Sequence, residues 1–186
     1  MTTAGVILAG GRGQRMGGKD KGTVDYNGLP LVQHVINRLT PQLDQIVISA
    51  NRNIDFYKAY NYPVLADDMG DYWGPLAGIA TAMNFCKCDL LLTVPCDTPR
   101  LPEDLLQRLS GVMLQQKVDV VMAQDSNRLH PVIALINCSL YEDLLAYLQR
   151  GERMVMKWMQ SQKWAAADFS DQTDYFTNIN SQDNIN

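Results

Sequence analysis

The chain has 186 residues, of which 46% are hydrophobic and 19% are charged, a composition that excludes a fibrous or intrinsically disordered protein. Its length suits a single domain with one continuous core. The net charge of −4 provides no basic surface for nucleic acid, and no apolar run approaches the ~20 residues of a membrane helix, so we expect neither partner.

The four cysteines, Cys86, Cys88, Cys96 and Cys138, have neither paired CxxC spacing nor the density of a secreted disulfide scaffold. The first residues, "MTTAG", lack the charged and apolar regions of a signal peptide. We therefore expect free thiols and a cytoplasmic protein.

Apolar, β-branched runs alternate with segments of helical periodicity through the first two thirds of the chain. The runs predict strands over 5–10, 45–51, 63–68 and 89–97, and the periodic segments predict helices over 31–39, 54–60, 75–85 and 102–116. We expect Pro102 to open the last of these helices, with acidic residues in its first turn. Such alternation is typical of a mostly parallel sheet that helices cover on both faces.

The pattern changes in the last third. Only the polar "DSNR" separates apolar runs at 118–124 and 130–137, which predicts a hairpin or a reversed strand. Helices are expected near 139–149 and 152–162, followed by a strand with a short turn. The predicted fold is therefore α/β with three layers, a mostly parallel sheet and an antiparallel portion in the second half.

The stretch "LAGGRGQRMGGKDKG", residues 8–22, holds six glycines and four cationic side chains directly after the first predicted strand. Loops that follow parallel strands gather at the sheet edge where open α/β folds bind ligands. Glycine lets backbone N–H groups approach an anion closely, and lysine and arginine add charge. The stretch predicts a site for a small anion, because a loop that merely turns the chain does not need four cations.

Two familiar phosphate loops fit this stretch poorly. A P-loop requires Ser or Thr after Gly18-Lys19, whereas Asp20 follows, so the hydroxyl group that holds magnesium is missing. A dinucleotide fingerprint requires a helix to begin at once, but Gly17, Gly18 and Gly22 interrupt any helix there.

The strand predicted over 89–97 ends in Asp97, which it delivers to the same edge. A single carboxylate beside phosphate oxygens is typical of a Mg²⁺ site, although Asp97 also suits a helix N-cap or Asx-turn. Asp67, Ser49 and Asn51 lie at the ends of other predicted strands. Asp67 can accept from the amino or imino groups of a base and Asn51 can pair with a base edge, but each is equally typical of a turn.

Taken together, the motifs resemble those of the molybdenum cofactor guanylyltransferase family, nucleotidyltransferases with a Rossmann-like fold. Residues 8–22 are similar to the family signature LAGGxxxRMGGxDKG. The motifs "NGxPL", "GPLAG", "PCDTP", "HPxIAL", "GERxVM", "DFSD" and "NxN" recur in the family's order, so the resemblance spans nearly the whole chain.

The resemblance implies Mg²⁺-dependent transfer of GMP from GTP to the terminal phosphate of molybdenum-bound molybdopterin, with release of pyrophosphate. It implies one nucleotidyltransferase domain over 1–186, with a nucleotide-binding half at about 1–100 and an acceptor-binding half at about 101–186. Further proteins of cofactor biosynthesis, and acceptor apoenzymes or their chaperones, are expected partners.

The resemblance also implies roles for single residues. Asp97 would carry the metal, Lys21 and Arg15 would act with it in catalysis, and Asp67 would face the guanine or ribose. The nucleotide-binding residues would be Leu8, Ala9, Gly10, Gly11, Gly18, Lys21, Ser49, Asn51, Asp67 and Asp97, and the acceptor would meet Asn178, Asn180 and His130. Where the family commonly has Asn, this chain has Ser49, so Asn51, water or backbone would take over that base contact.

The chemistry is consistent with these roles. Transfer is an in-line attack between two polyanions, so neutralising charge is the main task of the site. A phosphate nucleophile is already deprotonated at neutral pH, so no general base is required.

Two other functions compete with this one. A cytidylyltransferase acting on molybdopterin or another phosphate acceptor would share the fold, but such relatives tend to read LAAG where this chain has Ala9-Gly10-Gly11, and the additional glycine leaves room for a purine. A protein that only binds a nucleotide or the pterin would not need both Asp97 and Lys21, which are present.

Overall fold

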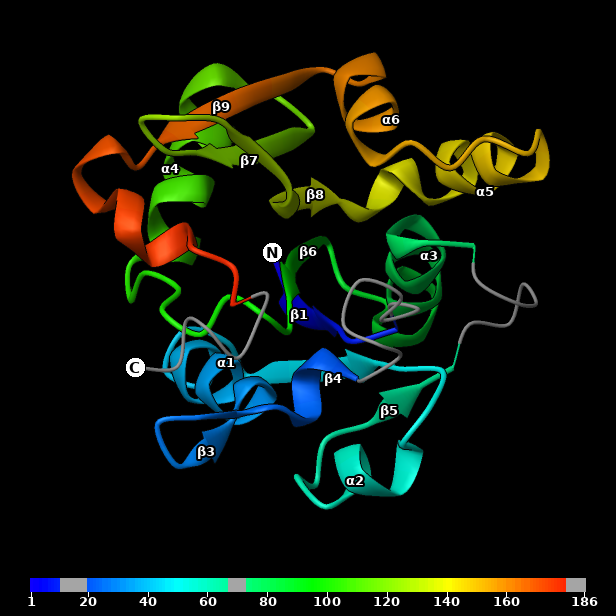
Figure 1. Ribbon diagram of the computed structural model, residues 1–186. Helices are drawn as coiled ribbons and strands as arrows, with labels where there is room; N and C mark the ends of the chain where they lie inside the picture. The colour runs from blue at the N-terminus through cyan, green and yellow to red at the C-terminus, as the bar shows by residue number, and fades with distance from the viewer. Residues whose placement is uncertain (11–19, 67–72, 180–186) are drawn as a thin grey trace.

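The computed structural model describes residues 1–10, 20–66 and 73–179. Its main sheet has seven strands. Their order is β5 (Val64–Leu65), β4 (Gln45–Ser49), β1 (Thr3–Leu8), β6 (Leu90–Pro95), β8 (Leu129–Asn137), β7 (Val120–Gln124) and β9 (Trp164–Asp168). In Figure 1 these strands follow one another from β5 at the bottom to β9 at the top. A separate two-stranded sheet is formed by β2 (Asp25–Tyr26) and β3 (Leu29–Pro30), which pair antiparallel.

The sheet is mostly parallel, as predicted. β1 pairs in parallel with β4 and β6, β4 with β5, and β7 with β9. β8 runs antiparallel to both of its neighbours, β6 and β7. The reversed strand expected after "DSNR" is therefore confirmed, and it lies inside the sheet between β6 and β7.

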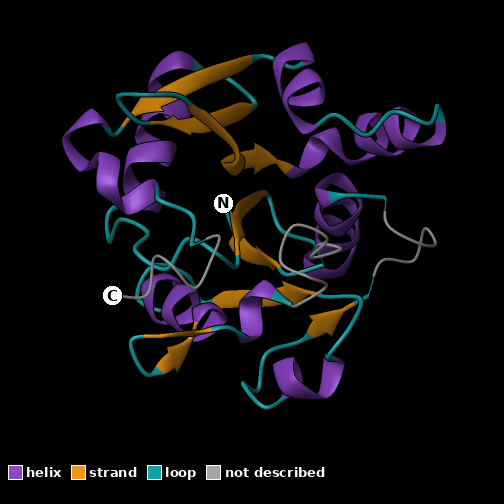
Figure 2. Cartoon of the chain, in the orientation of Figure 1, coloured by secondary structure: helices purple, strands orange, loops and turns teal. Residues whose placement is uncertain are grey.

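Helices cover both faces, which gives the three predicted layers (Figure 2). On one face lie α1 (Leu31–Leu39), α2 (Ile54–Lys58) and α4 (Leu105–Gln116). On the other lie α3 (Pro75–Cys86), α5 (Tyr141–Gln149) and α6 (Val155–Ser161). Three 3₁₀ turns complete the described chain: η2 (Lys21–Thr23), η3 (Cys138–Leu140) and η4 (Ser170–Phe176).

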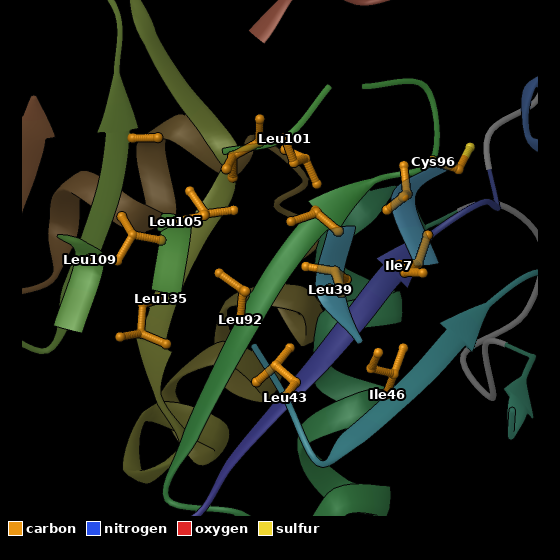
Figure 3. Packing of buried hydrophobic residues seen from close by; sticks show 14 of the residues in the cluster. Ile7, Leu39, Leu43, Ile46, Leu92, Cys96, Leu101, Leu105, Leu109 and Leu135 are labelled. Carbon is orange, nitrogen blue, oxygen red and sulfur yellow. The ribbon is translucent and has the colours of Figure 1, made fainter. Parts of the chain in front are cut away.

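The strands divide their side chains between these faces because successive residues of a strand point in opposite directions. In β4, Ile46 and Ile48 pack with α1, whereas Val47 packs with α3. Figure 3 shows the first of these two cores, in which Leu92 of β6 lies between Leu39 and Leu135. A sheet buried on both faces explains why its strands read as nearly continuous apolar runs.

The fourth long helix begins later than predicted. α4 starts at Leu105. Pro102 lies before the helix, and its carbonyl oxygen accepts from the N–H of Leu105 at 3.3 Å. Asp104 is the N-cap, so no acidic residue lies in the first helical turn. Its carboxylate instead contacts Arg108 at 2.7 Å, and the Gln42 side chain accepts from the N–H of Leu106 at 2.9 Å. Gln42, from a distant part of the chain, therefore supplies the side-chain acceptor in the first turn of this helix.

Candidate active site

The carboxyl ends of three parallel strands meet at one edge of the sheet. Leu8, the last residue of β1, is in register with Ser49 at the end of β4 and with Pro95 at the end of β6. All three residues line a cavity of about 520 Å³, which is within the range of small-ligand sites. A cavity therefore lies at the sheet edge where the site was predicted.

The cavity is also lined by residues at the start of β8, by the residue before it and by the last described residues. Arg128, His130 and Asn178 are among them. The complete lining is Leu8, Gly10, Ser49, Gly74, Pro75, Gly78, Pro95, Asp97, Arg128, Leu129, His130, Pro131, Val132, Ile133 and Asn178. Six of the predicted site residues thus share one cavity.

Asp97 and Lys21 form the charged centre of the site. Asp97 follows β6 and is only 6% exposed, and its Oδ2 lies 2.7 Å from Nζ of Lys21, which opens η2. An ion pair of this length is a charge-assisted hydrogen bond. Two side chains 76 residues apart in the sequence, predicted to act together, are therefore in direct contact.

The donor set around Asp97 suits Mg²⁺ rather than a metal with an all-protein cage. Within the described ranges, no three His, Cys, Asp or Glu side chains gather closely enough to hold a metal ion. Mg²⁺ is usually bound through one or two carboxylates, with phosphate oxygens and water completing its shell. One buried carboxylate that lines an open cavity meets that requirement.

The end of the described chain returns to Asp97. The N–H of Ile179 donates to the backbone oxygen of Asp97 at 2.9 Å, and the Asn178 side chain accepts from the Thr98 hydroxyl group at the same distance. Asn178 is thereby held beside the charged pair, on the side of the cavity where the acceptor is expected.

His130 has a structural partner as well as a place in the cavity wall. Its Nε2 lies 2.8 Å from Oδ2 of Asp125, and its ring stacks on Phe176 with 4.9 Å between centroids. Burial opposes ionisation of Asp125, but the hydrogen bonds from His130 and from the backbone N–H groups of Arg128 and Asn127 prevail and hold the carboxyl pKa below its usual 3.8. The imidazole ring is therefore fixed in orientation.

Ser49 and Asn51 each lie close to a glycine, Gly78 of α3 and Gly10 after β1. A Cβ atom added to Gly10 would lie 3.3 Å from Nδ2 of Asn51, and one added to Gly78 would lie 2.4 Å from Oγ of Ser49. Both glycines therefore allow close approach of the chain to the residues predicted to contact the base.

Ala9 is buried, and its N–H donates to the carbonyl oxygen of Ser49 at 2.8 Å, so that N–H serves the sheet edge rather than a nucleotide. The predictions for Gly11, Arg15, Gly18, Asp67 and Asn180 fall outside the described residues.

Sequence reasoning did not single out two cavity-lining residues. Gly78 belongs to the "GPLAG" motif, but its role depends on the contact with Ser49, which the motif does not reveal. The sequence predicts Arg128 only as part of a polar turn before β8, although it lines the cavity. Its charge, two residues before His130, is the signal that could have identified it.

Cys96 lies between β6 and Asp97 and is not a candidate nucleophile. Burial is the main cause that raises the pKa of its thiol far above 9.0, and Asp97 and Asp20 add to the shift. The thiol therefore stays protonated and acts as an apolar core group.

Comparisons with known proteins agree with this geometry. Residues 5–164 match the model of the MobA-like NTP transferase domain. The chain is 45% identical over 175 residues to the molybdenum cofactor guanylyltransferase of Shewanella loihica, covering 94% of this chain and 89% of that protein. It is 46% identical to the protein of the same name from Shewanella frigidimarina, with the same coverage of 94% and 89%.

The fold is similar to that of a crystal structure of molybdopterin-guanine dinucleotide biosynthesis protein A from Archaeoglobus fulgidus. The TM-score is 0.80 at 21% sequence identity, and the match covers 99% of this chain and 95% of the other. Among the helices of the described residues, none has the length and apolar character needed to cross a membrane.

Proposed function

The chain belongs to the MobA-like NTP transferases, and within them to the molybdenum cofactor guanylyltransferases; from this we propose that it transfers GMP from GTP to the terminal phosphate of molybdenum-bound molybdopterin, releasing pyrophosphate. The observation that carries the proposal is the contact of Lys21 with Asp97, which lines the same cavity as Leu8, Gly10 and Ser49.

This arrangement suits a reaction between two polyanions. In-line attack of one phosphate oxygen on the α-phosphorus requires positive charge near the triphosphate, and Lys21 supplies it at the edge where β1 ends. The glycine at position 10 lets the triphosphate approach the backbone. Because the attacking phosphate is already ionised, the site needs no general base, and neutral Cys96 has no part in the reaction.

We propose that Asp97 holds Mg²⁺ together with phosphate oxygens. The ion would neutralise charge on the triphosphate. The role of the chain itself is to present one buried carboxylate at the cavity wall and to keep Lys21 within 2.7 Å of it.

The acceptor would bind at the lining residues near the start of β8 and at the end of the described chain. Asn178 and His130 are held there by Thr98 and Asp125, and Arg128 adds a cation that can bind a pterin phosphate. The cysteines are free thiols, as in proteins of the reducing cytoplasm, and we propose that compartment for the reaction.

The test is pyrophosphate release from each of the four nucleoside triphosphates, with Mg²⁺ and with or without molybdenum-loaded molybdopterin. We expect release from GTP and only in the presence of the pterin. Release from CTP instead would replace the proposal with a cytidylyltransferase, and tight GTP binding without release would indicate a binding protein.

A variant connects the activity to the site. Asp97→Asn keeps the size of the side chain but removes its charge, and we expect a loss of about 10²–10³-fold in turnover. Asp44→Asn is the matched control, because Asp44 is exposed on the surface. Equal activity of the two variants would reject the role of Asp97.

A further inference from the structure

Asp20 is a buried carboxylate that lies next to the catalytic lysine in the sequence but does not line the cavity. It is 4% exposed, and its side chain caps η2 by accepting from the N–H of Gly22 at 3.2 Å. Its backbone oxygen accepts from the hydroxyl group of Thr23 at 2.9 Å. The short turn that carries Lys21 is therefore built around Asp20.

The second support of Asp20 comes from the segment that follows β4. The hydroxyl group of Tyr57, a residue of α2 with no exposed surface, donates to Oδ1 of Asp20 at 2.7 Å. Nδ2 of Asn53 donates to Oδ2 at 3.0 Å, and Nε of Arg52 lies 3.9 Å from the same oxygen. A carboxylate removed from water is tolerable only with such a set of donors.

Gly22 makes this arrangement sterically feasible. A Cβ atom at position 22 would lie 2.3 Å from the hydroxyl oxygen of Tyr57 and 3.1 Å from two of its ring carbons. Only glycine leaves the space through which the tyrosine reaches Asp20. The glycine that ends the loop motif thus has a specific packing function.

The contacts of Asp20 and Gly22 affect where the Lys21 ammonium group lies. A lysine side chain is long and flexible, so the position of its ammonium group depends on how firmly its backbone is held. Asp20, before Lys21, accepts a hydrogen bond from Tyr57. Gly22, after Lys21, lies so close to the Tyr57 hydroxyl group that a larger residue would not fit. Nζ then reaches Asp97 at 2.7 Å.

We propose that Asp20 and Tyr57 are positioning residues that hold Lys21 in place for the triphosphate. The inference rests on the proposed function for its kinetic consequence, but the position of Lys21 can be tested without turnover. Neither residue touches the cavity, so both act through the lysine.

The decisive variant is Tyr57→Phe, which removes the hydroxyl group and keeps the buried ring. Tyr60→Phe is its control, because Tyr60 follows the same helix and packs on Phe56, and its hydroxyl group makes no hydrogen bond with the described residues. Tyr57→Phe should raise the acetylation rate of Lys21 several-fold, measured by peptide mass spectrometry, while acetylation of the distant Lys117 stays unchanged.

Kinetics then separate positioning from loss of folded protein. Tyr57→Phe should lower kcat/KM for GTP about tenfold, the effect of one hydrogen bond to a charged group, and should raise KM for GTP but not for the pterin. A purely structural defect would lower kcat with both KM values unchanged. In a Lys21→Ala background, the additional effect of Tyr57→Phe on GTP affinity should vanish.

Unchanged acetylation of Lys21 in Tyr57→Phe, or an equal rise in Tyr60→Phe, would overturn the inference. Absence of pyrophosphate release from the unmodified protein would overturn the proposed function instead. The acetylation result distinguishes the two failures.

Discussion

Two glycines inside helices provide a matched test of how tightly α3 packs against the ends of β1 and β4 beside the cavity. A Cβ atom added to Gly78 in α3 would lie 2.4 Å from Oγ of Ser49 and 3.0 Å from Cδ2 of Leu8. A Cβ atom added to Gly111 in α4 would have no heavy atom within 4 Å. Gly78→Ala and Gly111→Ala therefore make the same chemical change in a crowded and in an open environment.

The expected free energies follow from two opposing effects. Replacing glycine by alanine within a helix stabilises the folded state by about 1 kcal/mol, and this gain applies to both variants. At position 78 the new methyl group also overpacks the site, which costs about 1–3 kcal/mol because Ser49 is buried and cannot move outward. The difference between the two variants in unfolding free energy is thus the overpacking cost alone.

Thermal unfolding measures this difference. Gly111→Ala should raise Tm by about 2–4 °C, and a difference of 2 kcal/mol would separate the two variants by about 4–8 °C in a chain of this size. Calorimetric titration should show weaker GTP binding for Gly78→Ala only, since Leu8 and Ser49 line the cavity. Equal stabilisation with unchanged GTP affinity would refute the close packing of Gly78 on Ser49.

Three further predictions concern other parts of the fold. Leu92→Ala should lower the unfolding free energy by about 2–5 kcal/mol in urea titrations, because Leu92 is fully buried in the sheet core. The pKa of Asp125 is lowered in the folded state, so its ionised carboxylate stabilises the fold fully above pH 3.8, and this stabilisation is lost as pH falls through the folded-state pKa. Asp125→Asn should therefore lose less unfolding free energy on acidification than the unmodified protein, measured by unfolding at several pH values. The hydrogen bond from Cys138 is the main cause that lowers the pKa of the Cys88 thiol to about 7, so Cys138→Ala should move the thiolate titration, followed by ultraviolet absorbance, back toward 9.0.

Local pattern predicted the elements well, because burial of the sheet on both faces leaves long apolar runs. The helix at Leu31–Leu39 has the predicted bounds, and the runs around β1, β4 and β6 are strands. The start of α4 could not be predicted, since the acceptor for the N–H of Leu106 comes from Gln42, which is 64 residues away in the sequence. A partner at that distance leaves no local signal.

The site shows the same division between local and distant causes. Asp97 and Lys21 could be predicted because the rule for parallel strands places both loops at one edge, and their residue types match the chemistry. The contact between Tyr57 and Asp20 could not be predicted, because it joins residues 37 apart, one in α2 and the other directly before η2. The motif contains Asp20, but it gives no indication of which element would support that carboxylate.

The reversed direction of β8 explains why the predicted acceptor residue His130 lines the cavity from the beginning of a strand. Ligands of open α/β sheets usually meet the carboxyl ends of strands, and Leu8, Ser49 and Pro95 follow that rule. β8 pairs antiparallel with β6, so its first residues lie beside the end of β6, and the Thr93 hydroxyl group donates to the Val132 carbonyl oxygen at 2.8 Å. A parallel strand in this position would have carried His130 to the opposite edge. The single reversal therefore unites the predicted nucleotide-binding and acceptor-binding residues in one cavity.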